Sequence, residues 1–342
     1  MTLDGDIVIK CIPDPGYVHR GEEKMCEYRT YIQNIPHLER PVILDSCGIL
    51  FPYVLAVEEL LGLSEKVPER AQYLRVIMAE FNRIISHLYW LAIQGIFTGH
   101  STMFMWATGD REYFIDLAAM ASGARVTFAY YVPGGVRCDV PPSWEDKVLK
   151  VCEYFEGRLQ EYKKIYFENP VFEKRTMDVG FLSKADAIAL GCVGPTLRAS
   201  GVKSDVRIDE PYSLYDTFEF SVPVMQEGDS WARCWVCFYE MLESLKIIKQ
   251  AIRKMRPGPV RLPLRGQLRG RVGEAYARTE AARGCMSYHI ISDGGPHPYR
   301  VRISTPSFRN LPAIPKVIEG YRLADVPVSF WSLNYWPVEA DK

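Results

Sequence analysis

The 342-residue sequence contains no long hydrophobic run. A helix that crosses a bilayer needs about 18 or more consecutive apolar residues, and no stretch of that kind is present. The first residues also lack the basic segment followed by an apolar segment that marks a signal peptide. We therefore expect a protein that does not span a membrane and that lies in the cytoplasm.

An excess of charge of either sign is also missing. The chain has 41 Lys and Arg residues against 42 Asp and Glu residues. Proteins that bind nucleic acids or anionic lipid surfaces concentrate positive charge, so neither kind of partner is expected. An apolar fraction of 48% and an aromatic fraction of 12% can instead supply a large interior or a buried subunit interface.

The sequence lacks several motifs of catalysis and cofactor binding. It has no GxGxxG or Walker loop and no GxSxG nucleophile motif, which disfavours nucleotide binding and serine-hydrolase chemistry by this chain. Nine scattered cysteines include one CxxC, Cys234-Trp235-Val236-Cys237, inside a predicted helix. A zinc or iron–sulfur site needs about four ligands, so this pair is interpreted as core cysteines and no metal is expected.

What the sequence has in abundance is helical periodicity. Apolar residues recur at three- and four-residue steps over 69–96, and Arg75, Asn82, Arg83 and Ser86 fall off this stripe. His87 lies beside the stripe and is interpreted as structural. Helices are predicted at 21–33, 54–61, 69–96, 110–122, 143–166, 183–191 and 229–256. Ser143, Ser183 and Asp229 are predicted N-caps.

Strand patterns are confined to the two ends. Residues 7–12 predict a short strand for which no partner is evident, and 286–290 with 299–303 predict a β-hairpin around a turn at 292–297. The predicted fold is α+β and mainly α, a bundle of long helices with a small C-terminal β-hairpin region. One domain is expected over 1–342, made of an N-terminal strand (1–16), a helical core (17–260) and an α+β part (261–342).

Two loops carry unusual residues. Pro133–Pro141 contains Gly134, Gly135 and Arg137, and can be a contact surface for a negative or polarisable group or simply a tight interhelical turn. Residues 19–24, which include His19 and Arg20, form a dense charged cluster that can equally be a self-paired surface. The residues alone leave both choices open.

Taken together, several stretches resemble one family, the D subunit of respiratory complex I. The matching stretches, in order, are 16–24 (GYVHRGEEK), 29–36 (RTYIQNIP), 53–58 (YVLAVE), 70–76 (RAQYLRV), 122–125 (SGAR), 133–141, 194–201 (GPTLRASG), 211–216 (PYSLYD), 228–229 (GD), 257–260 (PGPV) and 324–325 (AD). They cover essentially the whole chain. The stretch 102–105 is more similar to the archaeal, deazaflavin-dependent branch that reduces methanophenazine.

The resemblance implies a fold of the nickel–iron hydrogenase large-subunit type and a place in the peripheral arm, on the cytoplasmic side of the membrane. Its implied partners are a small iron–sulfur subunit, another peripheral-arm subunit and membrane-arm subunits. Electrons from NADH or a reduced deazaflavin would reach a quinone or methanophenazine from an iron–sulfur cluster held by the partner, coupled to ion translocation. Arg40 and Arg137 would face that cluster, while His19, Arg20, Ile43, Phe97, Gly134 and Gly135 are expected to line the acceptor cavity.

The departures from the family pattern concern proton donors. The family's N-terminal hairpin, which carries a histidine near the quinone, is expected to be missing, and Ile43 and Phe97 align with its quinone-binding tyrosine and its aspartate. Neither side chain can donate a proton. At the four nickel-binding cysteine positions of hydrogenases the chain has Val42, Asp45, Trp336 and Glu339, so hydrogenase chemistry is not expected.

Two functions follow. In the first, the chain is a subunit of an oxidoreductase and walls the cavity where the acceptor is reduced. In the second, it is a structural and coupling subunit of a hydrogenase-related membrane complex whose acceptor site is altered or lost. An independent soluble enzyme has no motif in its favour.

Overall fold

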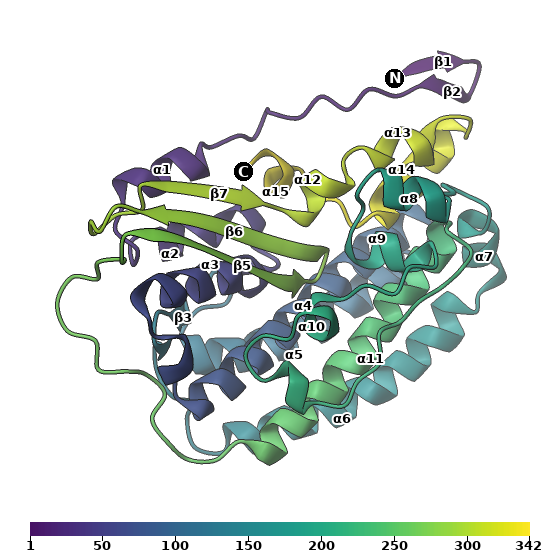
Figure 1. The fold of residues 1–342 in the computed structure, drawn as a ribbon. Helices are drawn as coiled ribbons and strands as arrows, with labels where there is room; N and C mark the ends of the chain where they lie inside the picture. The colour runs from purple at the N-terminus through teal and green to yellow at the C-terminus, as the bar shows by residue number, and fades with distance from the viewer.

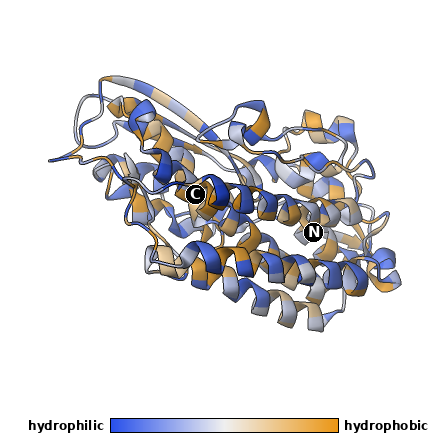
Figure 2. Cartoon of the chain, turned by 90° about the horizontal axis from the view of Figure 1, so that it is seen from below, coloured by the Kyte–Doolittle hydropathy of each residue, from blue (hydrophilic) through white to orange (hydrophobic).

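The computed structural model describes all residues from 1 to 342. Four long helices lie alongside one another beneath a three-stranded sheet, and short helices gather at the end of the molecule below the N-terminal hairpin (Figure 1). The long helices carry both apolar and polar residues along their length (Figure 2), as helices with one side toward the interior do. No helix combines the length and the apolar composition that a membrane crossing requires.

Most connections between the elements are short, and the longest runs from residue 255 to residue 272. The α-helices are α1 (Glu22–Tyr28), α2 (Asn34–Leu38), α3 (Ser46–Leu61), α4 (Glu69–Phe97), α5 (Ser101–Ser122), α6 (Trp144–Tyr162), α7 (Pro170–Thr176), α8 (Lys184–Ala189), α9 (Gly194–Ala199), α10 (Val206–Asp209), α11 (Ser230–Lys254), α12 (Pro306–Asn310), α13 (Ala313–Ile318), α14 (Val326–Ser332) and α15 (Pro337–Asp341). The strands are β1 (Thr2–Asp4), β2 (Ile7–Lys10), β3 (Tyr131–Val132), β4 (Gly135–Val136), β5 (Gly273–Ala281), β6 (Gly284–Ser292) and β7 (Arg300–Ser304). Short 3-10 turns include η1 (Arg40–Val42), and a π-helical turn, η3 (Lys163–Phe167), follows α6.

Helix α4 is the centre of the molecule, packed against α3, α5, α11 and α14. The predicted apolar stripe is buried, but so are Arg75, Asn82, Arg83 and Ser86. The polar residues beside the stripe are therefore part of the interior as well. Arg75 pairs with Glu58 at 2.6 Å and Asn82 accepts the Cys47 N–H at 2.7 Å. Partners of this kind allow polar side chains in an interior, and a hydrophobic periodicity does not reveal them.

The C-terminal sheet has the order β5-β6-β7 and is antiparallel throughout. The predicted hairpin is confirmed, with Tyr288 opposite Ile303 and Ile290 opposite Val301. Strand β5 was not predicted, because its small and polar residues alternate only weakly. A two-residue turn between Ala281 and Gly284 joins it to β6, and α3 packs against both strands.

The N-terminal prediction needs a correction. The strand at 7–12 has a partner, since β1 pairs with β2 to form a small hairpin. The same strand is tied to the C-terminal part, where the Val8 N–H donates to the Tyr321 carbonyl at 2.9 Å. From there the chain runs across the top of the molecule to α1 (Figure 1).

Helix boundaries show which end signals were reliable. The Ser183 hydroxyl accepts the Asp186 N–H at 3.0 Å and Asp229 accepts the Ala232 N–H at 2.8 Å, so both predicted caps are confirmed. Ser143 is wrong as a capping residue, because it has φ 63° and no side-chain cap bond. Helix α3 begins at Ser46 rather than near 54, and α5 at Ser101 rather than near 110.

The interior is one large apolar cluster with a smaller one beside it. The large cluster contains 69 residues and joins the long helices to the inner face of the sheet. The small cluster of 12 residues joins Val8 to the C-terminal helices. The helical core and the α+β part thus share an interior, which brings the N-terminal third of the chain and the last residues together.

Candidate functional site

Two buried carboxyl groups and one buried guanidinium meet where three distant segments converge. Asp45 precedes α3, Arg283 lies in the turn between β5 and β6, and Glu339 lies on α15. The Arg283 Nη1 is 3.6 Å from the Asp45 Oδ2, and its Nε is 4.0 Å from the Glu339 Oε2. All three side chains are at most 2% exposed. We name this group the Arg283 centre.

The backbone fixes the position of each member. The Ala282 N–H donates to the Asp45 Oδ2 at 2.9 Å, which ties the β5–β6 turn to the start of α3. The Ser307 hydroxyl bonds the Glu339 carboxylate. Asp45 and Glu339, two of the four positions expected from the resemblance to match the nickel-binding cysteines of hydrogenases, are thus brought together.

The other two positions lie alongside. The Trp336 Nε1–H donates to the Pro41 carbonyl at 3.2 Å, next to Val42, and the Arg283 guanidinium lies 5.8 Å from the Trp336 ring. The structure therefore gathers all four positions into one place, with no cysteine among them.

A row of aromatic rings leads away from this centre along α4. Trp336 contacts Tyr89 with ring centroids 6.1 Å apart, Tyr89 contacts Trp331 at 6.5 Å, and Trp331 contacts Phe97 at 6.1 Å. Reciprocal bonds from the indoles of Trp90 and Trp331 to each other's carbonyls, at 2.7 and 2.8 Å, hold α14 against α4. Tilted and edge-on arrangements of this kind are the ones that aromatic pairs prefer.

Burial controls the protonation of the Arg283 centre. It raises the pKa of Glu339 to about 7, although Arg283 and the Ser307 hydroxyl oppose the rise. Burial likewise raises the pKa of Asp45, against the attraction of Arg283. A single guanidinium between two carboxyl groups can balance only one negative charge, so a proton on one carboxyl is favoured near neutral pH.

The two predicted cluster-facing cations lie near each other. Arg40 and Arg137 are both exposed, and both act on the buried Glu39 carboxylate, which accepts the Ala129 N–H at 2.8 Å. Burial raises the pKa of Glu39 to about 7, while Arg137 and Arg40 act to lower it. Arg137 also bonds the Ser122 carbonyl at the end of α5.

The glycines of the same loop face inward. Gly134 and Gly135 are buried in the turn between β3 and β4, where the Gly134 N–H donates to Glu58 at 2.7 Å and the Gly135 carbonyl accepts from Arg75. A Cβ on Gly135 would lie 2.3 Å from the Val260 carbonyl. The segment 260–264 packs closely against both residues.

The remaining predicted cavity residues are spread around the Arg283 centre. His19 and Arg20 are exposed, with the His19 Nδ1 2.6 Å from the Asp341 carbonyl on α15 and the Arg20 Nε 3.6 Å from Glu22. Ile43 follows η1 and is 45% exposed. Phe97, half-buried at the end of α4, lies at the far end of the aromatic row.

Sequence reasoning missed a large buried ion-pair network under α4. The Arg198 Nη1 is 2.7 Å from Glu280, the Arg207 Nη2 is 2.7 Å from Asp205, and the His87 Nε2 is 2.8 Å from Glu240. Its members are Glu80, Arg83, His87, Arg198, Asp205, Arg207, Glu240 and Glu280. They come from several distant segments, so no local sequence pattern predicts the network. His87 is indeed held by a structural partner.

Cys234 and Cys237 are buried on α11, and burial raises the pKa of both thiols. Their burial agrees with the interpretation as core cysteines. No group of three or more His, Cys, Asp or Glu side chains has metal-binding geometry.

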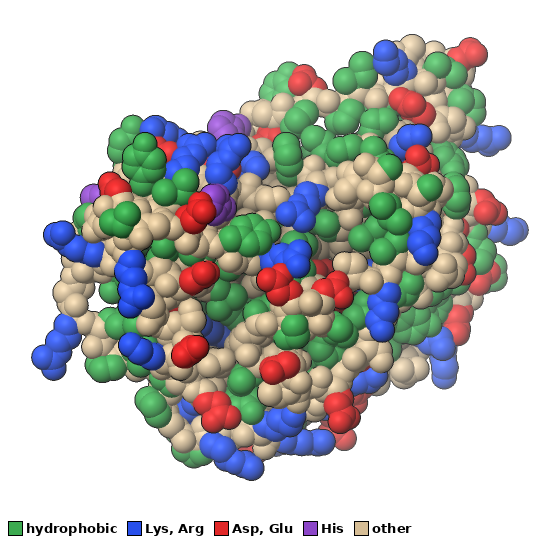
Figure 3. Space-filling view, in the orientation of Figure 1, with side chains coloured by type: hydrophobic (Ala, Val, Ile, Leu, Met, Phe, Trp, Pro, Cys, Tyr) green, Lys and Arg blue, Asp and Glu red, His purple; other side chains and the backbone are tan.

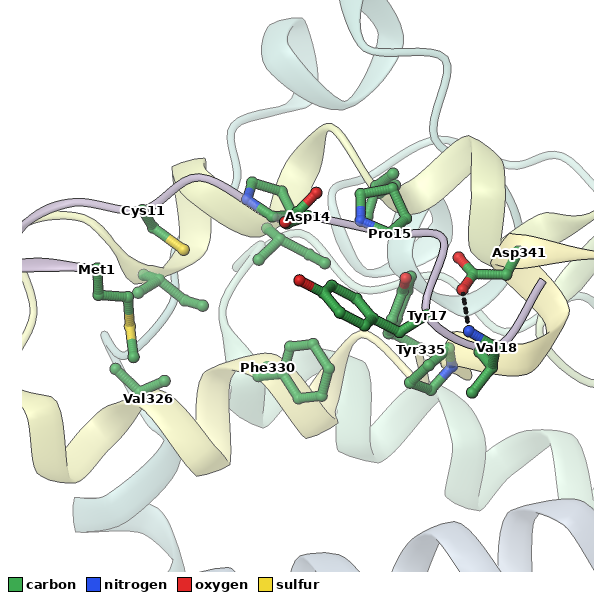
Figure 4. A pocket seen from close by; sticks show the side chains of 15 residues that line it. Met1, Cys11, Asp14, Pro15, Tyr17, Val18, Val326, Phe330, Tyr335 and Asp341 are labelled. Carbon is green, nitrogen blue, oxygen red and sulfur yellow. Dashed lines mark hydrogen bonds between the residues drawn. The ribbon is translucent and has the colours of Figure 1, made fainter.

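An apolar hollow of about 400 Å³ lies on the other side of α15 (Figure 4). Tyr17 of the N-terminal segment and Phe330 and Tyr335 of the C-terminal part direct their rings into it. The Val18 N–H donates to Asp341 at 3.0 Å, which closes one end. On the surface, basic side chains and histidines gather over α1 and β7 (Figure 3), where Arg300 pairs with Glu27 at 2.8 Å.

Comparison with known proteins identifies the family. The model of the "Respiratory-chain NADH dehydrogenase, 49 Kd subunit" family matches residues 98–269 and 265–342. This chain belongs to that family. It is 40% identical over 341 residues to the NADH-quinone oxidoreductase D subunit of Desulforamulus reducens, covering 100% of this chain and 93% of the relative. It is 39% identical over 367 residues to the NADH-quinone oxidoreductase D subunit of Geobacter sulfurreducens, covering 100% and 94%.

A solved structure of the same fold comes from an archaeal respiratory membrane complex, the membrane-bound sulfane sulfur reductase (MBS). The TM-score is 0.95 at 37% identity, over 99% of this chain and 93% of that chain. The resemblance to the D subunit of complex I and the mainly helical, hydrogenase-type fold with C-terminal strands are confirmed. The 49 Kd-type chain is thus a subunit of a complex-I-like oxidoreductase.

Proposed function

We propose that this 49 Kd-type subunit forms, with a small iron–sulfur subunit, the cavity in which electrons reduce a quinone or methanophenazine, coupled to ion translocation. The observation that carries the proposal is the convergence of the Arg283 centre, the aromatic row and the cations Arg40 and Arg137 around the start of α3. The complex would sit on the cytoplasmic side of the membrane, with a second peripheral-arm subunit and membrane-arm subunits as further partners.

The two exposed arginines suit a position beside a partner's cluster. A cluster gains negative charge when an electron arrives, and a nearby guanidinium stabilises that charge. Arg40 and Arg137 lie close enough to Glu39 to act on the same carboxylate. The two guanidinium groups would therefore face the partner subunit from one region of the surface.

The aromatic row and the exposed Ile43 suit a flat, apolar acceptor. Trp336, Tyr89 and Trp331 form a continuous series of rings from the Arg283 centre to Phe97. Ile43 and Phe97 offer shape and apolar contact but no proton. The acceptor would then be held by packing, and its polar head would be oriented by the Arg283 centre.

The test is acceptor reduction by the intact complex purified from native membranes. Ubiquinone, menaquinone and methanophenazine analogues are supplied in turn, with NADH or a reduced deazaflavin as the electron donor, with and without a cavity inhibitor. Inhibitor-sensitive reduction of one acceptor is expected. A complex that retains its iron–sulfur and membrane subunits but reduces none of them would overturn the proposal.

A second function is favoured by one set of observations. Ile43 and Phe97 occupy positions where the family is expected to have a tyrosine and an aspartate, and the 37%-identical structural relative is named a sulfane sulfur reductase rather than a quinone reductase. In this alternative the chain is a coupling subunit with an altered acceptor site. Its expected result in the same experiment is an intact complex without quinone or methanophenazine reduction.

A further inference from the structure

A narrow cavity lies behind the Arg283 centre, between α1, β6 and α15. Its polar lining consists of Glu22, Tyr288, Thr305, Glu339 and Lys342. The volume is about 10 Å³, which is close to what one water molecule requires. The cavity joins Glu339 of the centre to Glu22, whose carboxylate lies 3.6 Å from the exposed Arg20.

Several polar atoms around this cavity have no hydrogen-bond partner within the chain. They are both carboxylate oxygens of Glu22, the Oε1 of Glu339, the Tyr288 hydroxyl, and the Nε and Nη1 of Arg283. All four side chains are at most 2% exposed. Folded proteins pair nearly all such groups, because an unpaired buried group costs about 1–3 kcal/mol. A concentration of them in one cavity indicates a function other than stability.

The charges around the cavity do not balance without bound protons. Of the three buried carboxyl groups, those of Asp45 and Glu339 share one buried guanidinium, Arg283, and the carboxyl group of Glu22 has only the half-exposed Arg20 beside it, at 3.6 Å. The one cation that lines the cavity, Lys342, is partly exposed and is directed to the Ile303 carbonyl and Glu23. Arg83 and His87 of α4 act on Asp45 from farther away. Isolated carboxylates are unfavourable in such surroundings, so carboxyl groups here hold protons.

The pKa values agree with this charge count. Burial raises the pKa of Glu339 to about 7 and also raises the pKa of Glu22, although Arg20 and His19 oppose the latter. The pKa of Tyr288 is raised first by burial, and the Glu22 and Glu339 carboxylates both add to the rise. Tyr288 lines the same cavity as both carboxyl groups.

We propose that Glu22, Tyr288 and Glu339 form a proton relay that carries protons from the surface at Arg20 to the Arg283 centre. The proposal rests on the proposed function, since the relay ends at the proposed acceptor site. It supplies what that site otherwise lacks, because Ile43 and Phe97 have no proton to give.

The proton balance is simple. Reduction of a quinone-type acceptor takes two electrons, which arrive from the partner, and two protons. For each proton, the Glu339 carboxyl releases H⁺ toward the acceptor and becomes a carboxylate beside Arg283. The Tyr288 hydroxyl has no hydrogen-bond partner within the chain, so it passes a proton to Glu339 and receives one from Glu22 through the water that the cavity can hold. Glu22 then takes a proton from bulk water at the Arg20 end, so the relay itself is unchanged.

The test uses the intact complex with Glu22→Gln, Tyr288→Phe or Glu339→Gln in this chain. Each variant nearly preserves side-chain volume and removes one proton-carrying group. We expect acceptor reduction to fall about 10-fold or more, with a larger solvent deuterium isotope effect and a shifted pH profile. Glu22→Asp, which keeps a carboxyl group, should recover part of the rate.

Glu27→Gln is the matched control, because Glu27 lies on the same helix but is directed to Lys24 and Arg300. It removes one carboxylate outside the cavity and should leave the rate and the pH profile unchanged. A second readout is independent of turnover. The infrared band of a protonated carboxyl group, recorded on the complex near neutral pH, should weaken in Glu339→Gln and not in Glu27→Gln.

The outcomes separate the two proposals. A wild-type complex that reduces an acceptor, together with relay variants that keep the wild-type rate, isotope effect and pH profile, would overturn the relay and leave the proposed function intact. A wild-type complex that reduces no acceptor would overturn the proposed function and remove the destination of the relay. An infrared band unaffected by Glu339→Gln would overturn the proton-holding role of Glu339.

Discussion

At the scale of single residues, the surroundings of a charged side chain decide what it can do. Arg40 and Arg137 are exposed on one region, whereas Arg75 and Arg283 are buried among carboxylates and carbonyls. All four are arginines, and their neighbours in the sequence do not reveal which groups they contact. Their partners come from distant segments, so their roles follow from the fold.

Arg137→Ala should weaken electron transfer to the acceptor without unfolding the chain, because its exposed guanidinium has only the Ser122 carbonyl as a bonded partner. The measurement is the acceptor-reduction rate of the intact complex, with subunit content checked by gel. Arg125→Ala is the control, since Arg125 is also exposed and pairs with Glu112 and Asp116 on α5. Equal rates for wild type and Arg137→Ala would contradict the expectation.

Glu39 should make stability depend on pH between about 4.5 and 7. Its pKa in the folded chain is raised to about 7 from the ordinary value of 4.5, so the folded state holds a proton that the unfolded state has lost. The stability that this bound proton contributes is fully present below pH 4.5. As the pH rises to 7, the free energy of unfolding falls by about 1.4 kcal/mol per pH unit. Thermal melts at several pH values should show the melting temperature of Glu39→Gln rising relative to that of wild type from pH 5 to pH 8. A difference in melting temperature that does not change with pH would refute this expectation.

At the scale of elements, the close contact between the β3–β4 turn and the segment 260–264 depends on glycine. Gly135 has φ 149°, and a Cβ there would lie 2.3 Å from the Val260 carbonyl. Backbone groups of the β3–β4 turn also bond both Glu58 and Arg75 and so hold this buried pair in place. One missing side chain thus allows α3, α4 and this loop to pack together.

Gly135→Ala should therefore destabilise the chain by more than about 1 kcal/mol. Gly109→Ala offers the opposite expectation, because Gly109 is inside α5 and an added Cβ would meet nothing within 4 Å. Alanine there should stabilise by up to about 1 kcal/mol. Denaturant titrations of the two variants and wild type measure both effects. A stabilising Gly135→Ala would show that the loop can move away.

At the scale of the whole molecule, the buried ion-pair network joins α4, α9, α10, α11 and β5. Arg198 is central, since it contacts Glu240 at 2.5 Å and Glu280 at 2.7 Å. Burial raises the pKa of Glu280 despite Arg198, whereas Arg198 holds the pKa of Glu240 below its usual range despite burial. The helices and the sheet are therefore connected through charges as well as through apolar contacts.

Arg198→Met should be strongly destabilising, by about 3–5 kcal/mol, because it leaves two buried carboxylates without their main partner. Adding Glu280→Gln should recover part of the loss by removing one of those charges. The free energies of unfolding of wild type, the single variants and the double variant form the required cycle. Additive losses in the double variant would contradict direct coupling between Arg198 and Glu280.

The sequence by itself determined the family, the long helices and the C-terminal hairpin, because helical periodicity, alternation and family motifs are properties of neighbouring residues. The resemblance also led us to expect Asp45 and Glu339 at two positions that hold nickel-binding cysteines in hydrogenases. Only the tertiary structure decided that Arg283 lies between them, that Gly134 and Gly135 face inward, and that Glu22 and Tyr288 share a cavity with Glu339. Each of these depends on contacts between segments that are far apart along the chain, and the protonation of a buried carboxyl group depends on all of its neighbours at once.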